Sequence, residues 1–148
     1  MSAYRNVTFD EIEVGAAASA RRVLTQTEIE ALVLVSGDLE PFHMEDAGET
    51  STGLLAVDAV GISAVISGLL ERKLPGPGTR IVSLALEYDG QVSVGDELAA
   101  SVTVSEKHAD TGYVVIDCDA RVGERRVLWG TAIVEAPRSR VSYSDIAT

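Results

Sequence analysis

The longest apolar stretch of the chain decides the expected fold: residues 52–70 read TGLLAVDAVGISAVISGLL. This composition favours a helix that is buried nearly all round, as expected when a sheet wraps it. A membrane span is the alternative, but the stretch is barely long enough and carries Asp58 in its middle. The run LPGPG at residues 74–78 then predicts an abrupt end to the helix, because proline and glycine interrupt helical hydrogen bonding.

After this helix the hydrophobic period changes to two, which is typical of strands. One strand follows Gly78, and residues 92–96 predict a turn. Three longer segments rich in Val, Ile and Thr come next, at residues 97–107, 112–122 and 125–135. Consecutive strands joined by short turns form an antiparallel sheet. We therefore predict an α+β fold in which an antiparallel sheet wraps around a long central helix.

The N-terminal part predicts a strand at residues 17–24 and then a helix of about ten residues. Thr25 and Glu28 match a capping box, in which each side chain binds the backbone N–H of the other residue. At the other end of the chain, Pro137 predicts the end of the last strand. The segment from residue 138 to residue 148 has little apolar content, so we expect it to be loosely held.

Composition narrows the functional classes. The 148 residues are 46% hydrophobic and 24% charged, which is typical of a globular protein, and the length fits one domain over residues 1–148. A net charge of −11 disfavours binding to nucleic acid or to anionic membranes. With one cysteine, Cys118, and two histidines far apart, we expect no internal disulfide, no metal site and no cofactor. Residues 1–10 lack the pattern of an export signal, so a cytoplasmic location is expected.

The segment SGDLEPFH at residues 36–43 carries the main chemical signal, because it places Asp38 and His43 five residues apart across Pro41. The Gly-Asp step and the proline predict that the chain turns here, so both side chains are expected on a loop beside a packed helix. A carboxylate and a neutral imidazole that share one water can activate it and move its protons. Taken singly, each residue is more typical of a structural turn or loop.

Four segments of the chain together resemble the MaoC-like hot-dog proteins, which include the (R)-specific enoyl-CoA hydratases. They are FDEIEVG at 9–15, VSGDLEPFH at 35–43, LPGPGT at 74–79 followed by VSVGD at 92–96, and GTAIVEAP at 130–137. The second is similar to the hydratase motif Gly-Asp-x-Asn-Pro-x-His, with Glu40 in the position of the Asn. In this context the pair of Asp38 and His43 is interpreted as a site rather than as turn residues.

The resemblance implies a hot-dog fold that dimerises through its sheet edges, as a homodimer or a heterodimer of hot-dog subunits. It implies a site at the dimer interface for an acyl-CoA or an acyl carrier protein thioester. There Asp38 is the main base on a water that adds to a trans-2-enoyl group, and His43 helps to orient that water. A backbone N–H at the start of the central helix polarises the thioester carbonyl, with Gly53 as the implied donor.

The start of the central helix differs from the family, which has Ala-His-Gly-Met where this chain has no histidine between residues 53 and 59. Two alternatives to a hydratase therefore stay open. One is a non-catalytic subunit of a heteromeric dehydratase, and the other is an acyl-CoA thioesterase on the same fold.

The remaining candidate residues have simpler interpretations. Cys118 lies between two aspartates, so a reactive thiolate is not expected, His108 is expected at the surface, and Trp129 is expected in packing. Five cations are candidates for coenzyme A phosphates, although solvated surface charges are the simpler interpretation of most of them. They are Arg21, Arg22, Arg72, Lys73 and Arg80.

Overall fold

A five-stranded antiparallel sheet is the largest element of the structure, a computed structural model that describes residues 3–36, 56–57 and 59–144. Its strand order is β2-β6-β7-β8-β4, and every neighbouring pair is antiparallel. The strands are β2 (Ala17–Val23), β4 (Arg80–Tyr88), β6 (Glu97–His108), β7 (Tyr113–Val122) and β8 (Arg125–Glu135). The predicted sequence of strands joined by short turns is confirmed.

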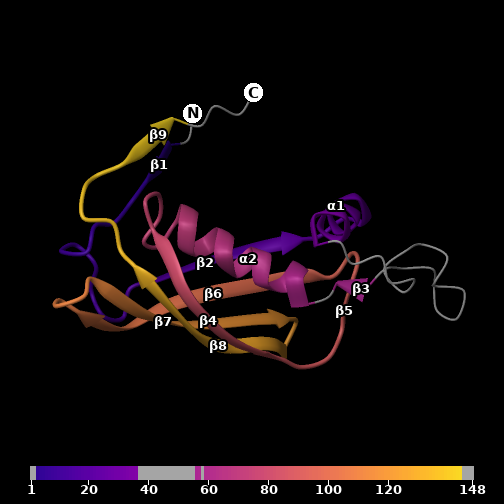
Figure 1. Ribbon diagram of the computed structural model, residues 1–148. Helices are drawn as coiled ribbons and strands as arrows, with labels where there is room; N and C mark the ends of the chain where they lie inside the picture. The colour runs from indigo at the N-terminus through magenta and orange to yellow at the C-terminus, as the bar shows by residue number, and fades with distance from the viewer. Residues whose placement is uncertain (1–2, 37–55, 58, 145–148) are drawn as a thin grey trace, which may run out of the picture.

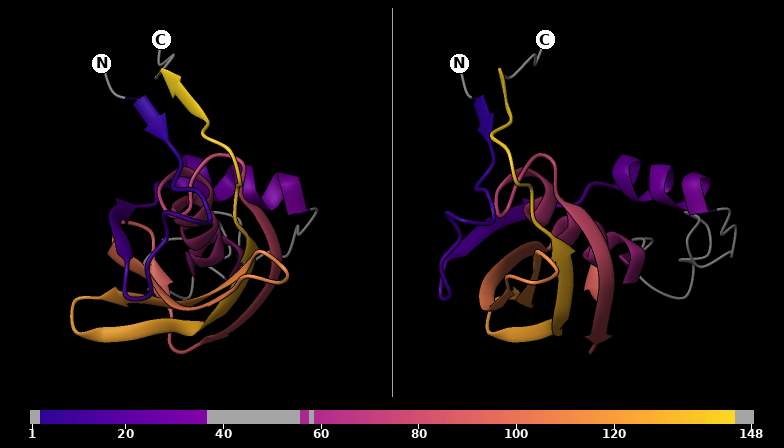
Figure 2. Two further views of the ribbon diagram at one scale, coloured as in Figure 1. Left: turned by 90° about the vertical axis from the view of Figure 1, so that its left-hand side faces the viewer. Right: turned by 60° about the vertical axis from the view of Figure 1, so that its left-hand side comes forward.

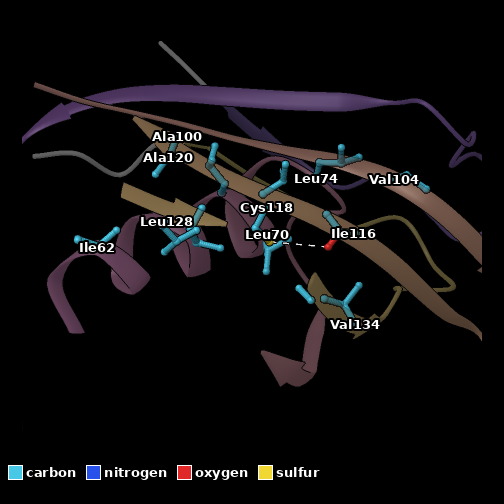
Figure 3. Packing of buried hydrophobic residues seen from close by; sticks show 14 of the residues in the cluster. Ile62, Leu70, Leu74, Ala100, Val104, Ile116, Cys118, Ala120, Leu128 and Val134 are labelled. Carbon is cyan, nitrogen blue, oxygen red and sulfur yellow. Dashed lines mark hydrogen bonds between the residues drawn. The ribbon is translucent and has the colours of Figure 1, made fainter. Parts of the chain in front are cut away.

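The core lies on the concave face of this sheet. Along β6 and β7 buried side chains alternate with half-buried ones, so that Val102, Val104, Val114 and Ile116 all point to one face. Figure 3 shows how aliphatic side chains of the sheet gather around Leu70 in this cluster. Because alternation assigns each residue to one face, the pairing register is strongly specified.

Helix α2 (Ala59–Arg72) lies across the concave face, and the sheet curves around it (Figure 2). Its buried face comprises Ile62, Ile66, Leu69 and Leu70, whereas Ala64 on the opposite face is exposed. The expectation that this helix is buried nearly all round therefore holds in part: from Gly61 to Leu70 every residue except Ala64 is buried or half-buried, but the helix ends and Ala64 are exposed. No helix within the described residues is long and apolar enough to cross a membrane.

Helix α1 (Gln26–Ser36) follows β2 directly and lies near the N-terminal half of α2 (Figure 1). The capping box is confirmed: the Thr25 N–H donates to Glu28 Oε1 at 2.9 Å, and the Glu28 N–H donates to Thr25 Oγ1 at 3.2 Å. Ile29 is buried and anchors the helix to the core. The sequence therefore fixes both the start of α1 and the face that it buries.

Two short ribbons complete the fold. Strand β3 (Ala56–Val57) pairs with β5 (Val92–Ser93), and β1 (Ala3–Arg5) pairs with β9 (Ser142–Ser144). The second ribbon projects away from the sheet (Figures 1 and 2). The expectation of a loosely held C-terminal segment is therefore wrong for the part that the structure describes, because backbone pairing holds it to the N-terminal strand.

Candidate functional site

The residues predicted to carry the chemistry, Asp38, His43 and Gly53, lie outside the described residues, so their roles stay predictions. The structure does describe the two elements that flank them. Helix α1 ends at Ser36, two residues before Asp38, and helix α2 begins at Ala59, six residues after Gly53. The first residue of a helix has no intrahelical partner for its backbone N–H, and in α2 this residue is Ala59.

Helix α1 is held firmly at its start. Besides the capping box, Glu28 forms an ion pair with Arg22 of β2. The N–H of Thr25 and then the Arg22 guanidinium lower the pKa of the Glu28 carboxyl, because both stabilise its charged form. The chain therefore reaches Ser36 from a helix whose start is tied to the end of β2.

A groove of about 740 Å³ lies between β2, α1 and the outward face of α2. Most of its lining is aliphatic: Ala20 and Leu24 come from β2 and its end, Ala31 and Leu32 from α1, and Val65 and Gly68 from α2. Figure 1 shows where β2, α1 and α2 lie in the fold. Apolar grooves of this size with a few polar groups are typical of small-molecule sites. The face of α2 that the sheet does not cover is thus one wall of a cavity.

Charged side chains form the rim of this groove, and most of them already have partners. Arg22 pairs with Glu28, and Lys73 Nζ donates to the backbone oxygen of Ser19 at 2.9 Å. Arg72 lines the same rim, and its guanidinium has no hydrogen bond or ion pair with the described part of the chain. It is therefore the rim cation that is most available for an anionic group of a ligand.

Two of the other cations considered from the sequence are also engaged. Arg21 Nη1 lies 2.9 Å from Glu97 Oε1, and Arg80 Nε lies 2.9 Å from Glu135 Oε1. Both pairs are exposed and bridge neighbouring strands of the sheet. Surface pairs of this kind contribute little to stability, but they do reduce the availability of these arginines.

A hydrogen bond that the sequence did not reveal links α2 to the edge strand β4. The hydroxyl oxygens of Ser63 and Tyr88 are 2.5 Å apart. The two residues are 25 positions apart in the chain and carry no motif, so only the fold brings them together. Tyr88 is 40% exposed, so this hydrogen bond lies at the protein surface, beside the N-terminal half of α2.

The other sequence candidates do not form a second site. Burial raises the pKa of the Cys118 thiol to about 11, with a further contribution from the nearby charge of Asp117, so the expectation of an unreactive thiol is confirmed. His108 is exposed, and its Nε2 lies 3.5 Å from Glu106 Oε1. The Arg126 guanidinium lies 4.7 Å from the centre of the Trp129 ring, in a cation–π contact. Among the described residues, no group of three His, Cys, Asp or Glu side chains is placed to hold a metal ion.

Comparison with known proteins gives consistent matches over most of the chain. The chain is 30% identical to an (R)-specific enoyl-CoA hydratase of Rhodospirillum rubrum, over 87% of this chain and 91% of that protein. It is 27% identical to a 3-hydroxybutyryl-CoA dehydratase of Methylorubrum extorquens, over 90% of this chain and 87% of that protein. The solved structure of the unliganded (R)-hydratase PhaJ1 of Pseudomonas aeruginosa matches with a TM-score of 0.90 and 26% identity, covering 99% of this chain and 96% of that chain. No protein-family model matches the chain.

Proposed function

Because the chain belongs to the family of (R)-specific enoyl-CoA hydratases, which are MaoC-like hot-dog proteins, we propose that it adds water to the double bond of a trans-2-enoyl thioester and catalyses the reverse dehydration. The enzyme is thus a lyase. Its proposed substrate is an enoyl thioester of coenzyme A or of an acyl carrier protein. The likeness to the Rhodospirillum hydratase over most of both chains carries this proposal. The reaction needs no cofactor, and we assign it to the cytoplasm.

In the proposed reaction, Asp38 is the base and His43 orients the water. Asp38 takes a proton from the water while the water oxygen bonds to C3 of the substrate, and the proton is then delivered to C2. Addition of both groups to one face of the double bond gives the (R)-3-hydroxyacyl product. Support comes from the position of Asp38 in the sequence, because it follows within two residues of a helix that is anchored at its start.

We propose that a backbone N–H at the start of α2 polarises the thioester carbonyl. Negative charge accumulates on this oxygen as water adds to C3, and an oriented N–H in a dry site stabilises it by about 3 kcal/mol. Gly53 was the donor implied by resemblance. Because α2 begins at Ala59, we also propose the Ala59 N–H, which the positive end of the helix dipole assists.

The groove beside α2 is the proposed binding site for the substrate. Its aliphatic walls suit the acyl chain, which is proposed to run along α2 from the site at the start of this helix.

We further propose that the functional unit is a dimer with another hot-dog subunit, paired through β4. Strand β4 is one edge of the sheet and exposes Val82, Leu84 and Tyr88, at 39%, 39% and 40%. The opposite edge, β2, exposes Val23 but also Arg21 and Arg22, which disfavour pairing. An exposed apolar edge strand is a template for pairing with a second chain, so β4 is the better candidate for the interface.

The test is the turnover of crotonyl-CoA by the purified protein, followed as loss of the absorbance of the enoyl thioester. We expect wild-type activity and an Asp38→Asn variant that is folded but has lost at least a hundredfold in kcat, as expected for a general base. Asp10→Asn is the matched control, because Asp10 is exposed and lies in a turn far along the chain from the site.

Near wild-type activity of Asp38→Asn contradicts the proposed mechanism. Release of free thiol without loss of the double bond identifies a thioesterase instead. If the purified protein alone is inactive and activity is recovered on mixing with a related subunit, the chain is the non-catalytic subunit of a heteromeric dehydratase.

A further inference from the structure

Gly68 occupies an unusual place on the groove-facing side of α2. It is half-buried and lines the groove, and a Cβ built on it meets no heavy atom within 4 Å. Its backbone φ lies outside the left-handed region, so the helix does not require glycine here. Glycine is also among the least favourable residues inside a helix. Neither the backbone nor the packing of the described residues therefore explains why this position lacks a side chain.

The space that Gly68 leaves open is continuous with other small residues around the groove. Ala64 lies one helical turn earlier, Ala20 lies on β2 and Ala31 on α1, and all three line the same cavity. From Ala64 to Arg72 the axis of α2 rises about 12 Å, at 1.5 Å per residue. Small side chains from three elements thus keep open a channel that is long enough for an extended alkyl chain.

We propose that Gly68 determines the length of the acyl chain that the enzyme accepts. The missing side chain admits the tail of a medium-length 2-enoyl thioester along α2, and a larger residue at this position restricts the enzyme to short substrates. This inference rests on the proposed hydratase function and deepens it, since it names the class of acyl group. The tail is recognised by apolar contact with the groove walls, which adds to affinity with each buried methylene.

The discriminating variant is Gly68→Leu, which adds bulk to the groove at a position where a Cβ meets no heavy atom within 4 Å and places a strong helix former in α2. We measure kcat/KM for trans-2-octenoyl-CoA and for crotonyl-CoA and compare their ratio. The ratio is expected to fall at least tenfold in Gly68→Leu. Ala64→Leu, which adds bulk one turn earlier in the same groove, is expected to lower it in the same direction.

Ala17→Leu is the matched control, because it adds similar bulk to an exposed position on β2 that does not line the groove. Its ratio is expected to stay within twofold of the wild-type value. Circular dichroism and the melting temperature establish that each variant is folded. An unchanged ratio in folded Gly68→Leu and Ala64→Leu overturns the inference.

Binding separates this inference from the proposed function. Calorimetry with octanoyl-CoA and acetyl-CoA, which the hydratase reaction does not consume, measures the preference for long chains directly. If the wild type hydrates no enoyl thioester but Gly68→Leu still weakens octanoyl-CoA binding tenfold relative to acetyl-CoA, the function is wrong and the role of Gly68 stands. If the wild type binds neither compound, both are wrong.

Discussion

Asn6 joins three segments of the chain, and its removal provides a quantitative test of the fold. It is 1% exposed and is the one polar residue in the buried class within the described part of the chain. Its Nδ2 donates to the backbone oxygens of Pro77 at 3.0 Å and Ser139 at 2.8 Å, and its Oδ1 accepts the N–H of Val141 at 3.0 Å. One side chain thus connects the N-terminal segment, the turn after α2 and the segment before β9.

The magnitude follows from these three contacts. Asn6→Ala removes all of them and leaves two carbonyl oxygens and one N–H without their partner. Each buried group that loses its partner costs about 1–3 kcal/mol. Water can reach part of the vacated space, because Ser139 is exposed, so we take the lower limit for each group. The free energy of unfolding is then expected to fall by about 3 kcal/mol, which lowers the melting temperature by about 6–12 °C for a domain of this size.

Urea unfolding followed by circular dichroism measures this loss. Asn6→Asp is expected to be at least as unstable, because a carboxylate accepts from Val141 but cannot donate to the two carbonyl oxygens. Gln26→Ala is the control, since its exposed side chain makes one hydrogen bond to Glu30, and it is expected to change stability by less than about 0.5 kcal/mol. The reasoning is refuted if Asn6→Ala unfolds at the wild-type urea concentration.

Two further predictions concern other parts of the molecule. Gly130→Ala is expected to lower the free energy of unfolding by about 2 kcal/mol in urea, because a Cβ at Gly130 would lie 2.1 Å from the backbone oxygen of Ala85 on the neighbouring strand; wild-type stability would contradict this close approach. The raised pKa of Cys118, about 11 against 9.0, means that the unfolded chain ionises first. Stability is therefore expected to fall between pH 9 and pH 11 and to lack this decrease in Cys118→Ala, as measured by unfolding at several pH values.

The strands could be predicted well from the sequence because their signals are local. Alternating apolar residues and glycine-containing turns bound each long strand, and β6, β7 and β8 agree with the predicted ranges to within one residue at each end. The start of α1 could also be predicted, because the two residues of the capping box, Thr25 and Glu28, lie within one helical turn of each other.

The errors concern neighbours that are distant in the chain. Nothing in the apolar run of α2 tells which side the sheet will cover, so the expectation of a helix buried nearly all round misses the exposed face at Ala64. The C-terminal segment has few apolar residues, yet backbone hydrogen bonds and Asn6 hold it. Low hydrophobicity is a poor guide where backbone pairing provides the attachment.

The candidate site likewise combines a local motif, which the sequence predicts, with a groove that only the fold assembles. Asp38 and His43 form a short motif and could be proposed from sequence. The groove is built from β2, α1 and α2, whose lining residues are separated by up to 53 positions, as for Ala20 and Lys73. A periodicity signal did exist, since Ala64 and Gly68 are small residues four apart on one helical face. That these small residues line a groove becomes clear only when the opposite walls, β2 and α1, are known.

The ribbon of β1 and β9 has a consequence for engineering the chain. Arg5 pairs with Ser142, and Ala3 with Ser144, in an antiparallel ladder, so these two strands leave the body of the protein as neighbours, with paired Cα atoms about 5 Å apart. A circular permutant that joins Ser144 to Ala3 through a brief peptide and opens at the exposed Gly123–Glu124 turn would keep every strand of the large sheet uncut.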